Sequence, residues 1–133
     1  MGLYLCVFEG DEEIEGVEVG AYRDFATFRD AVATHLKGGS RYPNLMLHSD
    51  SEGTWSPEEA RELEKELSEI AKAFEDLPPA PTSEWQSQVM RELGVTPRNL
   101  YECFIDVDGE PLIQRLIELC RISQKSGRPV LFQ

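Results

Sequence analysis

Residues 56–74 read SPEEARELEKELSEIAKAF, and this stretch predicts a helix that packs on a hydrophobic core. Ser56 suits the N-cap position, Pro57 suits the first helical position, and Glu59 completes a capping box with Ser56. The apolar residues recur at steps of three and four, which places them on one face, and they are Ala60, Leu63, Leu67, Ile70, Ala71 and Phe74. The proline-rich residues 78–81 then end the helix and form a connector too short to separate two domains.

Short apolar segments on both sides of this helix predict a sheet. Residues 3–8 are apolar on both faces, which is typical of a central strand covered on both sides. Residues 14–19 alternate Ile or Val with Glu, so they predict a more exposed partner strand, with Gly16 as a bulge, in a hairpin. Residues 44–48 and 129–132 predict two further short strands.

Three more helices are expected. Asp24 can cap a helix whose apolar face is formed by Phe25, Phe28, Val32 and Leu36. A shorter helix is expected from Ser83 to just before Gly94, and a third from Pro111 to Gly127, whereas residues 100–107 fit either a strand or irregular structure. The order of elements predicts an α+β fold, a small mixed sheet of about four short strands with three to four helices packed on it. Residues 1–133 are expected to form a single domain.

The composition excludes several classes of function. The chain has 133 residues, with 13 Lys and Arg against 25 Asp and Glu, so its formal net charge is −12. Direct binding of nucleic acid requires a basic face, and the sequence has no basic run. The longest apolar run is six residues, too short to cross a membrane, and no basic region precedes it as in a secretory signal. Three cysteines far apart fit a reducing compartment, so we expect a cytoplasmic protein.

Motifs for metal binding and catalysis are weak. The two histidines lie in different predicted elements, and residues 106–110 resemble a calcium loop in composition but not in spacing, so we expect no metal and no cofactor. His48 and Asp50, at the end of a predicted strand, are the best catalytic-looking pair. Such residues more often stabilise a turn, so we expect no catalytic residue, and a small enzyme using His48 and Asp50 is kept as an alternative.

The acidic residues are concentrated near the N-terminus. Residues 1–20 contain six acids and no Lys or Arg. This pattern fits either a solvated hairpin or a negative patch that steers a basic partner. Trp55 and Trp85 lie beside polar residues near helix starts, where aromatic residues can anchor an interface, although half-buried tryptophans are commoner there.

Four stretches of the sequence together resemble a bacterial family. They are GLYLCVFEGDEEIEGVEVG at 2–20, LMLHSDSEGTWSPEE at 45–59, LYECFIDVDGEPLIQRLIELC at 100–120 and PVLFQ at 129–133. In these stretches the chain resembles immunity protein 70, one of the immunity families of polymorphic toxin systems. The resemblance implies a cytoplasmic protein, made beside a toxin, that binds the toxin domain and blocks it without being an enzyme. It carries over no binding residue, because the family has no contact motif that we can match.

The residues that bind the partner must therefore be chosen from the sequence alone. We expect a surface formed by the hairpin and the loop after the third predicted strand, with Asp11, Glu12, Glu13, Glu15, Asp50, Glu52 and Trp55. The expected partner is a cognate toxin domain, for example a nuclease with a basic substrate-binding face, and the chain is expected to be a monomer. A further alternative is a regulatory module that pairs through the apolar stripe of helix 57–76.

Overall fold

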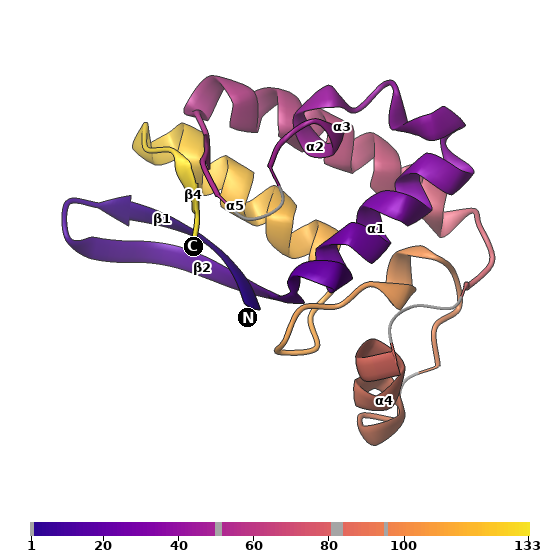
Figure 1. The fold of residues 1–133 in the computed structure, drawn as a ribbon. Coiled ribbons are helices and arrows are strands. Elements are labelled where there is room, and N and C mark those ends of the chain that lie inside the picture. The colour runs from indigo at the N-terminus through magenta and orange to yellow at the C-terminus, as the bar shows by residue number, and fades with distance from the viewer. Residues whose placement is uncertain (1, 50–51, 81–83, 95) are drawn as a thin grey trace.

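The computed structural model describes residues 2–49, 52–80, 84–94 and 96–133. The strands are β1 (Gly2–Glu9), β2 (Glu12–Ala21), β3 (Thr54–Trp55) and β4 (Val130–Phe132). The helices are α1 (Tyr22–His35), α2 (Pro43–Met46), α3 (Pro57–Glu75), α4 (Glu84–Glu92) and α5 (Leu112–Ser126), with 3-10 turns at Lys37–Gly39 and Tyr101–Cys103 (Figure 1). The α+β fold is therefore confirmed.

The sheet has the strand order β2-β1-β4-β3. Each neighbouring pair of strands is antiparallel, so the whole sheet is antiparallel, whereas the sequence predicted a mixed sheet. The central position predicted for residues 3–8 is confirmed, because β1 lies between β2 and β4. The pairing of β4 with β1 brings the first and last strands of the chain together.

One face of the sheet carries the core. Leu3, Leu5 and Val7 of β1 are fully buried, and they belong to one cluster with the apolar faces of α1, α3 and α5. These three helices lie on the same side of the sheet in Figure 1. At the centre of the helical layer, the Phe28 ring meets the rings of Phe74 and Phe104 edge-on, with centroids 6.3 and 5.3 Å away.

Helix α3 forms as its sequence predicts. The Ser56 hydroxyl accepts from the Glu59 N–H at 3.1 Å, and the Glu59 carboxylate accepts from the Ser56 N–H at 3.0 Å. The apolar stripe is spent on the core, with Ala60, Leu63, Leu67, Ile70 and Phe74 buried and Ala71 partly buried against them. The stripe is therefore not available for pairing with a second helix.

The prediction of a strand at residues 44–48 is wrong. These residues begin within α2, and the third strand lies later in the chain, at Thr54–Trp55. The cause is the buried Glu66 of α3, whose carboxylate accepts from the backbone N–H groups of Asn44 and Leu45 at 3.2 and 3.1 Å. These bonds satisfy the free N–H groups at the start of α2, and residues 44–48 alone give no sign of them.

Several helix ends differ slightly from the expectation. Helix α1 begins at Tyr22, and Asp24 lies within its first turn and accepts from the Ala21 N–H at 2.8 Å. Helix α5 ends, as predicted, at Gly127, which adopts a left-handed φ of 71°. Residues 100–107 resolve into the short 3-10 turn at Tyr101–Cys103 and one bridge between Ile105 and Pro111.

Candidate partner-binding surface

The hairpin of β1 and β2 carries the acidic residues near the N-terminus. Its tip is a tight turn in which Gly10 adopts φ 64°, and Figure 1 shows this tip extending beyond the ends of the helices. Glu9, Asp11, Glu12 and Glu13 are all exposed there. The bulges of the hairpin fall at Ile14 and Val19, which have no Cα partner on β1, and not at Gly16 as expected.

The face of the sheet opposite the core is open. Tyr4, Phe8 and Leu131 are half-buried but do not pack against the core cluster, and among the described residues no helix crosses this face. The second layer expected over residues 3–8 is therefore not present among the described residues, although Cys6, which alternates with Tyr4 and Phe8 on this face, is itself fully buried. A strand with apolar residues on both faces is buried in most proteins, so the lack of cover here marks a surface suited to a partner.

A hydrogen bond fixes an acid on this open face. The Tyr4 hydroxyl donates to Oε1 of Glu13 at 2.6 Å. The Tyr4 ring reaches Glu13 by passing over Gly16, where a Cβ atom would lie 1.9 Å from the hydroxyl oxygen. This explains the glycine in the middle of β2. The hydrogen bond to Glu13 and then burial raise the pKa of Tyr4 to about 12.

A depression of about 260 Å³ lies at the end of the open face away from the hairpin tip. Its walls are Tyr4, Glu18 and Val107, and its remaining lining is Gly2, Leu3 and Gly20. The Val107 N–H donates to the Glu18 carbonyl oxygen at 2.9 Å, which closes the outer edge of β2 at this point. Among the described residues, no donor is paired with the Glu18 carboxylate, and this side chain is exposed.

Arg115 of α5 anchors the hairpin to the body of the protein. Its guanidinium donates from Nη2 to the Gly16 carbonyl oxygen at 3.1 Å and from Nε to Oδ2 of Asp106 at 3.3 Å. Asp106 is fully buried, and its Oδ1 accepts from the N–H groups of Asp108 and Glu110 at 2.9 and 3.0 Å. The acidic 106–110 segment is thus a turn tied to an arginine.

The residues predicted to bind the partner do not form one surface. Asp11, Glu12 and Glu13 lie at the hairpin tip. Glu52 is exposed just before β3, at the end of the sheet that faces away from the tip, so strand geometry puts it roughly 20 Å from the tip. Glu15 faces the helices and pairs with Arg115 at 3.8 Å. Trp55 is 1% exposed and packs edge-on against the Phe132 ring, so it is part of the core and not of the surface. Asp50 lies outside the described residues.

His48 has a structural environment. Its ring stacks on Phe132 with centroids 4.2 Å apart. Nδ1 lies 2.8 Å from the Ser49 carbonyl oxygen, and Nε2 lies 2.8 Å from the Thr54 carbonyl oxygen. Both ring nitrogens are therefore directed at backbone carbonyls of the loop before β3. This geometry agrees with the interpretation of His48 as a residue that stabilises a turn.

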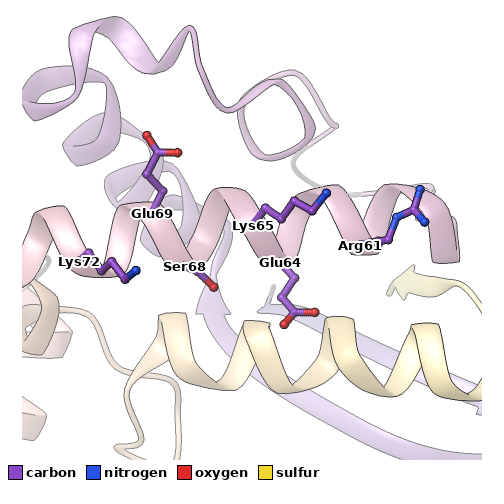
Figure 2. Close-up of a pocket in the computed structure, with 6 residues that line it drawn as sticks. All are labelled: Arg61, Glu64, Lys65, Ser68, Glu69 and Lys72. Atoms are coloured by element: carbon purple, nitrogen blue, oxygen red, sulfur yellow. The ribbon is translucent and has the colours of Figure 1, made fainter.

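The outer face of α3 offers a contrast to the open sheet face. A shallow depression there is lined by Arg61, Glu64, Lys65, Ser68, Glu69 and Lys72. Figure 2 shows Glu64 directed toward α5, where Arg121 Nε lies 3.0 Å from its carboxylate. Glu69 points away from α5 and pairs with Arg41 at 3.0 Å. Charges of both signs are thus interspersed and most of them are paired, so this face has no strong preference for a basic partner.

The described residues contain no group of three or more His, Cys, Asp and Glu side chains arranged to hold a metal ion. Cys6, Cys103 and Cys120 are free and buried, and burial raises the pKa of each thiol. No helix within the described ranges is long and apolar enough to cross a membrane.

Comparison with known proteins adds one finding. A sequence model of the family described as immunity protein 70 matches residues 3–132, nearly the whole chain. Searches of curated proteins and of solved structures found no match.

Proposed function

Because the chain belongs to the immunity protein 70 family, we propose that it binds a cognate toxin domain in the bacterial cytoplasm and neutralises it as a stoichiometric inhibitor. The observation that carries the proposal is the exposed tip of the hairpin, within a segment at positions 1–20 that has six acids and no basic residue. A toxin that acts on nucleic acid needs a basic face, and an acidic inhibitor can compete for that face. No catalytic step is proposed for this chain.

The hairpin tip suits the capture of such a partner. The backbone of the tip extends past the helical layer in Figure 1, and its acidic residues are exposed, so their field meets an approaching basic surface first. Complementary charge of this kind raises the association rate more than it slows dissociation, and salt screens it.

Co-expression with the product of the gene immediately upstream tests the proposal. We expect growth rescue and a one-to-one complex that weakens as the salt concentration rises. The triple variant D11K/E12K/E13K should slow association and flatten its dependence on salt. The proposal fails if the upstream toxin is active but is neither neutralised nor bound. Association kinetics unchanged in the triple variant would instead show that the hairpin tip is not the capture surface.

A further inference from the structure

The open sheet face combines aromatic rings with acids of a single sign. None of the four strands contains Lys or Arg in its sequence. Register places Glu18 opposite Tyr4 and Glu13 opposite Phe8, so the two acids and the two aromatic residues share one face of the sheet. A carboxylate next to a ring face is a favourable setting for a guanidinium group, which can pair with the carboxylate and stack on the ring.

The depression at the end of this face is the size of one side chain. At about 260 Å³ it is smaller than the cavities that usually hold small-molecule ligands. Tyr4, the exposed Glu18 and Val107, which is 39% exposed, line it. Gly2 and Gly20 contribute no side chain that would fill it.

We propose that this depression receives a basic side chain of the toxin domain, with arginine fitting best, while the rest of the open face packs against the surrounding toxin surface. This inference rests on the proposed function and assigns its partner a specific contact. The hairpin tip attracts the toxin, and Tyr4, Glu18 and Val107 receive the basic side chain. Glu13 lies between the two on the open face, within hydrogen-bond distance of Tyr4.

The site is prepared in advance of binding. Because the Tyr4 hydroxyl donates to Glu13 at 2.6 Å over Gly16, the Tyr4 side chain at the depression is held in place before the partner arrives. Arg115 fixes the Gly16 carbonyl from the other side of the sheet. A prepared site loses less conformational entropy when it binds.

The negative charge of this face favours a basic protein surface over a second copy of the chain or nucleic acid. A second copy of the chain, at −12, would bring Glu13 and Glu18 toward like charges, which is unfavourable. Nucleic acid is disfavoured for the same reason. A basic protein surface is the occupant that matches the carboxylates and the exposed ring carbons.

Two pairs of variants test the inference in the full-length chain, with the upstream toxin as the probe. E13Q/E18Q removes two charges from the open face, and E58Q/E62Q removes two from exposed positions on α3, so the net charge is the same in both. V107F fills the depression, whereas L47F enlarges an exposed apolar residue on another element. Circular dichroism and urea unfolding check that each variant is folded before its Kd is measured.

We expect E13Q/E18Q and V107F each to weaken binding by about tenfold or more, through faster dissociation. The two control variants should remain within about twofold of the original chain. Y4F, which keeps the ring and removes the hydroxyl, should weaken binding by a few-fold. Hydrogen exchange of β1 and β2 should slow in the complex.

Three outcomes would overturn the inference while leaving the proposed function in place, provided that the original chain rescues growth. One is equal weakening by both charge-neutralised pairs. Another is unchanged binding by E13Q/E18Q and V107F. The third is a dimer of the chain whose interface protects the open face from exchange. Absence of any complex with the original chain would overturn the proposed function itself.

Discussion

The tie between Arg115 and Asp106 gives the sharpest prediction of stability. Removing one partner of a buried ion pair commonly costs about 3–5 kcal/mol, because the other charge stays buried without compensation. Asp106 keeps two backbone N–H donors, and the Arg115 side chain is 21% exposed. We therefore expect Arg115→Met to lower the free energy of unfolding by about 2–3 kcal/mol.

Urea unfolding followed by circular dichroism measures this cost, and the same helix supplies a matched control. Arg121 also pairs with an acid, but its side chain is 60% exposed, so Arg121→Met should cost less than about 1 kcal/mol. Asp106→Asn retains the Oδ1 acceptor and removes the charge. In that background Arg115→Met should cost about 1–2 kcal/mol less than in the original chain.

A cost of Arg115→Met no greater than that of Arg121→Met, or a cost unchanged in the Asp106→Asn background, would show that the Arg115–Asp106 pair does not stabilise the fold in this way. Hydrogen exchange provides a second readout. Loss of the bond from Arg115 to the Gly16 carbonyl should speed exchange in β2 more than in α3.

Three further predictions concern individual side chains. The pKa of Tyr4 is raised from 10.0 to about 12, so the unfolded chain releases this proton first. The stability that the Tyr4–Glu13 bond contributes should be intact below pH 10 and lost between pH 10 and 12. Because the pKa values of Tyr42 and Tyr101 are also raised, the titration of Tyr4 is read as the difference in absorbance near 295 nm between the original chain and Tyr4→Phe. Phe74→Ala, at a fully buried ring, should destabilise the chain by about 3–5 kcal/mol in urea unfolding. Cys120, whose pKa burial raises to about 12, should resist iodoacetamide at pH 8 until urea unfolds the chain; rapid alkylation of the native chain would contradict its burial.

Elements with local signals could be predicted from the sequence. The capping box and apolar stripe of α3 lie within the helix itself, and both are present in the structure. The prediction of a strand at residues 44–48 was wrong because the carboxylate that caps α2 belongs to Glu66, about 20 positions later in the chain. A short apolar run with no local cap is equally consistent with a strand.

The candidate site was predictable in part. The acids of the hairpin tip are evident from composition, but their relation to Tyr4 depends on the register of β1 with β2, which two bulges set. The anchor through Arg115 joins residues 16, 106 and 115, and no sequence pattern links them. The open face was missed because apolar residues on both sides of a strand do not reveal whether a second layer covers it.

The position of β4 has a consequence for the order of folding. Leu5 pairs with Phe132, so the centre of the sheet cannot close until nearly all of the described chain has left the ribosome. The β1–β2 hairpin needs only local contacts and can form much earlier. Until β4 arrives, β1 presents an unpaired edge, and neighbouring carboxylates on β2 discourage its pairing with another nascent chain. The acids of β2 would thus serve the nascent chain before any partner is met.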